Sequence, residues 1–168
     1  MEKNYKQILN DITTFVFDID GVLTDGNLGV TLDGQLLRSM NVKDGFALKK
    51  ALKEGYEILI ISGGTNEGTR TRLKDLGITN VHLGIQDKVE CLEEFFDIYD
   101  IKAENTAYMG DDIPDIYPMQ KVALPTCPQD AVNEVKAASL YVSHKNGGHA
   151  CVRDLIEQVM KSQGKWKI

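Results

Sequence analysis

The residues most able to do chemistry begin with an acidic pair, Asp18 and Asp20, which follows the apolar run TTFVF. Two carboxylates this close repel one another, so a cation between them is expected. A strand that continued through the pair would place both side chains on one side. Gly21 lets the chain turn at once and exposes backbone amides to an anion. Two solvated loop acids are the alternative, but the flanking FVF and GVLTD make the motif more specific than a bare Asp-x-Asp.

Two further groups suit an anionic phosphate. Ser62 and Gly63 come directly after the apolar run EILII. A small hydroxyl and free amides at a strand end, ahead of a helix, suit a phosphate oxygen, although such a loop is commonplace on its own. Lys88 stands at the start of a predicted helix. The helix dipole disfavours a cation there, so a partner anion is worth expecting, and the alternative is a solvated lysine.

A second acidic cluster follows another apolar run. Gly110 is followed by Asp111, Asp112 and, after Ile-Pro, Asp115. Helix capping explains one of these carboxylates, since aspartate is a good N-cap residue, but it does not explain all three. The order acid pair, serine, lysine, acid pair is hard to obtain by chance. We therefore expect the four groups to share one edge of a sheet.

The elements between these groups alternate between strand and helix. The predicted strands cover residues 13–17, 57–61, 81–83 and 106–109, with late edge strands at 121–124 and 140–142. The predicted helices cover residues 44–54, 66–76, 88–99 and 151–160. Asp33-Gly34 marks a hairpin turn between arms at 27–31 and 35–42. This order favours an α/β fold with a doubly wound, mostly parallel sheet, in which ligands bind beyond the carboxyl ends of the strands.

The composition fits one domain over residues 1–168, with 42% hydrophobic and 26% charged residues. The net charge of −6 argues against nucleic acid as a partner. Cys91, Cys127 and Cys151 form no Cys-x-x-Cys pair, so we interpret them as reduced core thiols and not as zinc ligands or disulfides. Because no long apolar run and no signal-peptide pattern occur, the sequence predicts a cytoplasmic protein that does not span a membrane.

Residues 14–115 resemble the haloacid-dehalogenase-like (HAD) phosphatase superfamily, whose four motifs match here as DIDGVLTD, SG, K and GDDIPD. The resemblance implies a Rossmann-like core and a Mg2+-dependent phosphatase. Asp18 would attack phosphorus and form an aspartyl-phosphate. Asp20 would protonate the leaving alkoxide and then activate the water that hydrolyses the intermediate. The physical logic is that a phosphate and a carboxylate nucleophile repel each other unless a cation neutralises both.

The same resemblance implies ligands for the metal and for the phosphate. Mg2+ would be held by the carboxylates of Asp18 and Asp111 and by the main-chain carbonyl of Asp20. Asp112 would support the site, and Asp115 would act from further away. The residues that would hold the phosphoryl oxygens are Ser62, Gly63 and Lys88.

Superfamily members often insert a cap domain, but the intervals between the motifs here leave no room for one. The chain looks closest to the capless 3-deoxy-D-manno-octulosonate 8-phosphate (KDO 8-phosphate) phosphatases, which share the phrases NVKDG (41–45) and GGHACVRDLIE (147–157). This resemblance implies hydrolysis of KDO 8-phosphate, a small sugar-acid phosphate, in lipopolysaccharide precursor biosynthesis. It also implies a homotetramer in which β-hairpin flaps build a central barrel and a neighbouring subunit completes each active site.

Two substrate contacts, Asp44 and Arg153, are carried over from the same family. Each has a structural alternative, since Asp44 is a good helix N-cap and Arg153 could be a solvated helix residue. The glycine-rich segment before the last helix is interpreted as flexible enough to reach a neighbour's site.

Other functions stay open. A sister group hydrolyses the 9-phosphates of nine-carbon sialic acids (KDN or N-acetylneuraminate), but it tends to carry a glutamate where Gly64 stands and a lysine near Asp75. The octulosonate enzymes commonly have a basic residue at the Gly64 position, so this chain departs from both groups. Cationic side chains on the following helix could serve a substrate carboxylate or form a solvated face: Arg70, Arg72 and Lys74. A receiver-like phospho-acceptor domain, an inactive homologue and a general sugar-phosphate scavenger are further alternatives.

Overall fold

A computed structural model describes residues 4–168 and shows one six-stranded parallel sheet in the strand order β5-β4-β1-β6-β7-β8. The strands are β1 Thr14–Phe17, β4 Glu57–Ile61, β5 Val81–His82, β6 Thr106–Met109, β7 Leu124–Cys127 and β8 Tyr141–Val142. Every neighbouring pair in this sheet runs parallel. The predicted doubly wound α/β fold is confirmed.

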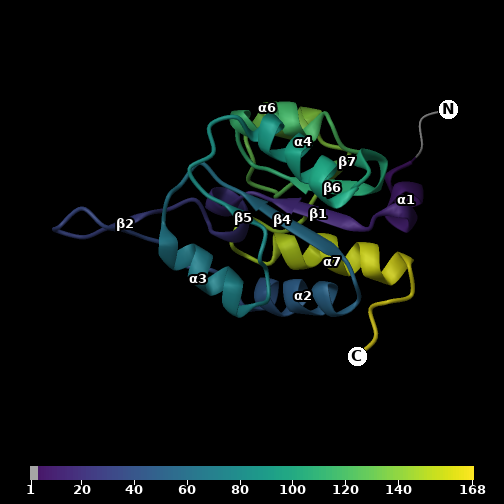
Figure 1. The fold of residues 1–168 in the computed structure, drawn as a ribbon, viewed down its shortest axis with the longest axis horizontal. Helices are drawn as coiled ribbons and strands as arrows, with labels where there is room; N and C mark the ends of the chain where they lie inside the picture. The colour runs from purple at the N-terminus through teal and green to yellow at the C-terminus, as the bar shows by residue number, and fades with distance from the viewer. Residues whose placement is uncertain (1–3) are drawn as a thin grey trace.

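Helices cover both faces of the sheet, with α2, α3 and α7 on one side and α4 and α6 on the other (Figure 1). The helices are α1 Tyr5–Ile8, α2 Val42–Lys53, α3 Glu67–Asp75, α4 Lys88–Tyr99, α5 Ile116–Met119, α6 Asn133–Ala138 and α7 Cys151–Ser162. Along β1, Phe15 and Phe17 enter the core beside α2 and α7, whereas Val16 enters the core beneath α4. This alternation explains why the central strands β1 and β6 are buried along their whole length, since both of their faces are covered.

The register of the central strands brings their carboxyl ends to one level. Phe17 pairs with Ile60 of β4 and with Met109 of β6. The residues that follow these strands therefore emerge side by side, at the edge where α/β sheets bind ligands.

A two-stranded hairpin projects far from the body of the molecule (Figure 1). Its strands are β2 Gly29–Val30 and β3 Leu36–Leu37, which pair antiparallel. The hairpin is as predicted, but the arms predicted at 27–31 and 35–42 are too long. The second arm already ends at Leu37, and residue 42 belongs to α2, which Asn41 caps through a side-chain oxygen that accepts a hydrogen bond from Lys43 N–H at 2.8 Å.

The end of the sheet also differs from the prediction. A strand was expected at 121–124, at an edge, whereas β7 covers Leu124–Cys127 and lies between β6 and β8. Residues 121 and 122 instead form a turn after α5, with hydrogen bonds back to Pro118 and Met119. β7 is hard to predict from the sequence because it contains Pro125, and proline is uncommon inside sheets. None of the described helices combines the length and the apolarity needed to cross a membrane.

Candidate active site

Seven of the predicted site residues line one cavity of about 430 Å³ at the carboxyl edge of the sheet. They come from four places: the segment after β1, the loop after β4, the first residue of α4 and the loop after β6. Asp115 and Gly64 line the same cavity. The predicted residues are Asp18, Asp20, Ser62, Gly63, Lys88, Asp111 and Asp112.

Lys88 sits between two carboxylates. Its Nζ lies 3.1 Å from Asp18 Oδ2 and 2.8 Å from Asp115 Oδ1, and the lysine is only 7% exposed. Burial lowers the pKa of Lys88, but the charges of Asp18 and Asp115 raise it, and the net pKa lies above the usual value. The cation is therefore kept beside Asp18 inside the cavity.

Acidic oxygens from Asp18, Asp111 and Asp115 all lie within 4.8 Å of one another. Burial, and next the charges of Asp18 and Asp115, raise the pKa of Asp111 to about 8. Asp111 Oδ1 is buried and has no hydrogen-bond partner among the described residues. One lysine does not balance three carboxylates, and an unpartnered carboxylate oxygen is a ligand that Mg2+ prefers. These residues fit a divalent cation.

Asp115 has a larger part in this site than the sequence indicates. It is almost fully buried, and it accepts hydrogen bonds from Lys88 Nζ, from Tyr108 OH at 2.8 Å and from Asp111 N–H at 3.1 Å. Asp112 is exposed, and its Oδ1 accepts from Ile113 N–H at 2.8 Å at the start of a 3₁₀ turn, Ile113–Asp115. The 3₁₀ turn folds the chain back so that Asp115, four residues after Asp111, reaches the Asp111 N–H.

Gly21 is required by a close approach. A Cβ at this position would lie 1.8 Å from Asp111 Oδ2, and its φ of +85° is one that residues with side chains rarely adopt. The glycine therefore allows the loop after β6 to press against the segment after β1, which brings Asp111 to Asp18.

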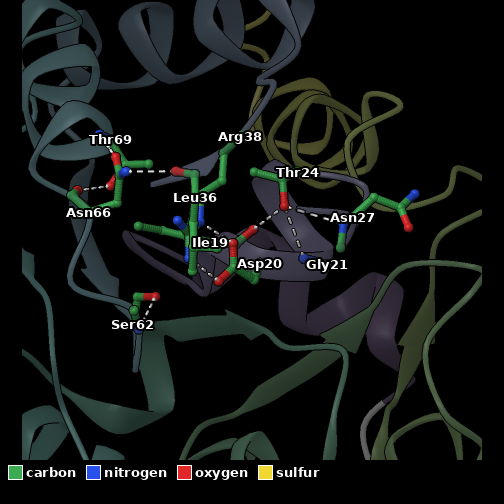
Figure 2. Close-up of polar contacts among 12 residues, drawn as sticks. Ile19, Asp20, Gly21, Thr24, Asn27, Leu36, Arg38, Ser62, Asn66 and Thr69 are labelled. Atoms are coloured by element: carbon green, nitrogen blue, oxygen red, sulfur yellow. Dashed lines mark hydrogen bonds and ion pairs between the residues drawn. The ribbon is translucent and has the colours of Figure 1, made fainter. Parts of the chain in front are cut away.

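Asp20 does not belong to the cluster of Asp18, Asp111 and Asp115, and its carboxylate instead pairs with an arginine. β1 ends at Phe17, so the strand does not continue through the acid pair. Asp20 Oδ1 accepts from Arg38 Nε at 2.7 Å and Oδ2 from Arg38 Nη2 at 3.0 Å (Figure 2). The sequence reasoning missed Arg38, and no local signal points to it, since it comes from the hairpin arm 18 residues away.

Ser62 lines the cavity from the loop after β4. Its N–H donates to His82 O at 2.9 Å, which continues the pairing of β4 with β5 by one residue. Its Oγ accepts from Gly64 N–H at 3.2 Å (Figure 2). The loop is thereby fixed with a small hydroxyl at the end of a strand, which suits a phosphate oxygen.

Asp44 and Arg153 do not line this cavity. Asp44 Oδ1 accepts from Arg153 N–H at 2.8 Å and thus caps α7, because Ala150 before that helix offers no capping side chain. The idea that Asp44 caps its own helix is wrong, since Asn41 does so. The Arg153 guanidinium lies 5.5 Å from the centre of the Phe46 ring and 5.5 Å from the centre of the Trp166 ring, and the three residues line a separate cavity.

The glycine-rich segment before α7 is packed, which corrects the expectation of a flexible segment. Gly148 N–H donates to Val22 O at 2.9 Å. A Cβ at Gly147 would lie 1.9 Å from Gly21 O, and one at Gly148 would lie 2.5 Å from Asp25 N. Glycines here allow backbone to pack on backbone, so that the segment supports the turn that carries Asp20.

Comparisons with known proteins point in one direction. No protein-family model matches the sequence. The chain is 33% identical over 155 residues to the 3-deoxy-D-manno-octulosonate 8-phosphate phosphatase KdsC of Salmonella typhi, covering 92% of this chain and 82% of that protein. It is 31% identical over 160 residues to KdsC of Haemophilus influenzae, covering 95% and 89%.

A solved structure is similarly close. The 3-deoxy-D-manno-octulosonate 8-phosphate phosphatase of Moraxella catarrhalis superposes with a TM-score of 0.92 at 28% identity, covering 96% of this chain and 92% of that one. That crystal structure is a complex with a magnesium ion, a phosphate ion and a KDO molecule.

Proposed function

The chain belongs to the family of 3-deoxy-D-manno-octulosonate 8-phosphate phosphatases, and on that premise we propose that it hydrolyses KDO 8-phosphate to KDO and inorganic phosphate. The observation that carries the proposal is the cavity in which Asp18 contacts Lys88 beside Asp111. These are the parts that an aspartate-based phosphatase needs. The reaction would serve lipopolysaccharide precursor biosynthesis, and residues 1–168 would act as one hydrolase domain.

The chain's own residues account for both half-reactions. An oxygen of Asp18 attacks phosphorus, the bond from phosphorus to the sugar oxygen breaks, and Asp20 gives its proton to that oxygen. Asp20 then takes a proton from water, whose oxygen attacks phosphorus and releases phosphate from Asp18. Lys88 and Ser62, with the Gly63 amide, hold the phosphoryl oxygens on which charge develops.

We further propose that Mg2+ is held by the carboxylates of Asp18 and Asp111 and by the main-chain carbonyl of Asp20, with Asp112 in support. Asp115 contributes an oxygen to the same cluster. When bound, the ion would neutralise the negative charge that otherwise keeps a phosphate away from the Asp18 carboxylate. The unpartnered Asp111 Oδ1 and the raised pKa of Asp111 support this placement.

The test is phosphate release from KDO 8-phosphate, compared with KDN 9-phosphate and a panel of hexose phosphates. We expect KDO 8-phosphate to be turned over fastest, chelation by EDTA to stop turnover and added Mg2+ to restore it. The sialic-acid alternative stays open because Gly64 departs from the pattern of both groups. A faster rate with KDN 9-phosphate would favour it. Equal rates across hexose phosphates would indicate a scavenger. A label from a small phosphodonor that stays on the protein for minutes would indicate a receiver.

A homotetramer is the proposed assembly, with each active site completed by a neighbouring subunit. The projecting hairpin exposes large apolar side chains that a single chain leaves uncovered: Leu28, Val30, Leu32, Leu36 and Leu37. Apolar surface gathered on one projecting element is typical of a site that other copies cover.

Asp44 and Arg153 stay predicted substrate contacts. The free, buried thiols of Cys91, Cys127 and Cys151 suit a reducing compartment, which supports the proposed cytoplasmic location.

A further inference from the structure

Arg38 is the point at which the projecting hairpin enters the active site. It comes one residue after β3, and Leu36 O in that strand accepts a hydrogen bond from Asn66 Nδ2 at 3.1 Å. Asn66 is itself fixed, because its Oδ1 caps α3 by accepting from Thr69 N–H at 3.0 Å. Figure 2 shows the arginine reaching from this anchored arm towards Asp20. The position of Arg38 therefore depends on the hairpin base and on the start of α3.

The backbone around Asp20 is held separately from its side chain. Thr24 Oγ1 accepts from Gly21 N–H at 3.3 Å and from Gly26 N–H at 3.3 Å (Figure 2). These bonds fix the turn but leave the rotation of the Asp20 carboxylate free. Among the described residues, the only side chain with a hydrogen bond to that carboxylate is Arg38.

Arg38 and Asp20 form a bidentate ion pair. Nε and Nη2 of Arg38 each meet a different oxygen of Asp20, at 2.7 Å and 3.0 Å. Two parallel charge-assisted bonds fix the plane of a carboxylate as well as its distance, which one point contact cannot do. The absence of a side chain at Gly64 makes room for this fork, since a Cβ there would lie 3.0 Å from Arg38 Nη2.

The two oxygens of Asp20 have different surroundings. That same Gly64 Cβ position lies 3.5 Å from Asp20 Oδ2 and 3.5 Å from Ser62 Oγ. Oδ2 therefore faces the space beside the Ser62 hydroxyl, which we propose binds a phosphoryl oxygen of the substrate. Oδ1 has the shorter bond to the arginine.

We propose that Arg38 is the positioning residue for Asp20, holding Oδ1 through Nε so that Oδ2 is aimed at the leaving oxygen of the substrate. This inference rests on the proposed phosphatase function. When Oδ2 carries a proton it no longer accepts from Nη2, and the Nε bond to Oδ1 alone keeps the carboxyl group in place. Oδ2 then gives this proton to the sugar oxygen as the phosphorus–oxygen bond breaks, and it regains a proton from the attacking water.

The experiment compares kcat and KM of Arg38→Met, Arg38→Lys and the wild type on KDO 8-phosphate with Mg2+. Lys53→Met, which removes an exposed cation at the end of α2, is the matched control. We expect Arg38→Met to lower kcat by about 10- to 100-fold with KM changed less than about threefold, as when a general acid–base group is misplaced. Arg38→Lys should restore part of kcat, because a lysine can make one of the two bonds.

A double-mutant cycle separates positioning from a general structural effect. In an Asp20→Asn background, Arg38→Met should change kcat by less than about twofold, since Arg38 acts through that carboxylate. Equal losses in both backgrounds would overturn the proposal, as would a rise in KM with kcat unchanged, which would make Arg38 a substrate-binding residue. Arg38→Gln replaces Arg38→Met if thermal melting shows that the latter is unfolded.

The substrate question is kept apart by repeating the cycle with p-nitrophenyl phosphate. Water attack on the aspartyl-phosphate is common to every phosphomonoester substrate, so the dependence on Asp20 and Arg38 should persist there. Turnover of this ester without turnover of KDO 8-phosphate would reject the proposed substrate and still test Arg38.

Discussion

Lys88 and Asp115 determine the charge balance around Asp18, the proposed nucleophile. Lys88 contacts Asp18 and Asp115 together, and Asp115 also accepts from the N–H of Asp111. Breaking such a buried pair by removing one partner leaves an uncompensated charge, which is costly. The arrangement therefore keeps Asp18 beside a cation while its neighbours stay fixed.

At Asp18, replacement by asparagine should abolish turnover while the protein stays folded. A carboxamide oxygen is a poor nucleophile, so kcat should fall by on the order of 1000-fold or more. Phosphate release and circular dichroism check the two halves of this expectation. Asp97→Asn, at an exposed site on α4, is the matched control and should keep full activity. More than a trace of turnover in purified Asp18→Asn would reject Asp18 as the nucleophile.

Asp44 should make the stability of the protein depend on pH. Burial raises its pKa to about 6, although the Arg153 and Ala150 N–H bonds and the charges of Arg153 and His149 oppose the shift. A raised pKa means that the folded state binds the proton more tightly than the unfolded chain does. The stabilising contribution is therefore complete below about pH 3.8, the unfolded value, and is lost as the pH rises through about 6.

Asp44→Asn removes this titration and keeps an oxygen for the Arg153 N–H. Relative to wild type, its free energy of unfolding should rise by on the order of 2–3 kcal/mol between about pH 4 and pH 7. Urea unfolding across that range measures the difference. Asp97→Asn again serves as the control and should follow wild type. A constant difference between Asp44→Asn and wild type would show that Asp44 has an ordinary pKa in the folded protein.

At the scale of elements, the segment before α7 supports the turn after β1. Gly147→Ala should destabilise the protein by about 3 kcal/mol, because the new Cβ would overlap Gly21 O and force the backbones apart. Gly164→Ala is the control. Gly164 has a positive φ but open space around it, so this variant should lose only the stability that the left-handed conformation costs an alanine. Urea midpoints compare the two. Equal losses would mean that the close approach to Gly21 is not tight.

At the scale of the whole molecule, the hairpin should decide the assembly. Val30 and Leu36 are paired across β2 and β3, and both are exposed. If the proposed tetramer forms, the double substitution Val30→Gln with Leu36→Gln should convert it to monomers and lower kcat, because other copies would no longer gain by covering these paired apolar side chains. Sedimentation velocity measures the assembly, and phosphate release measures the activity.

Ile98→Gln provides the control for assembly, since this exposed apolar residue lies on α4 and not on the hairpin. It should sediment like wild type. A wild-type protein that sediments as a fully active monomer would refute completion of the site by a neighbouring subunit.

Much of the fold follows from local pattern. The sequence predicts β4, β6 and α4 at the residues where the structure has them, because continuous apolar runs and a helical stripe are strong local signals. It misses α6, a six-residue helix in which Val135 alone is buried. A helix this short has too few apolar positions for its period to be seen.

The sequence by itself determined the order of strands and helices and the types of residue at the strand ends, since both are local properties of the chain. Only the tertiary structure decided which carboxylate meets which cation. Asp20 takes Arg38 from 18 residues away, and Asp115 meets Lys88 from 27 residues away. Such pairs depend on where a hairpin and two strand ends come to lie in space, because a local pattern carries no information about distant neighbours.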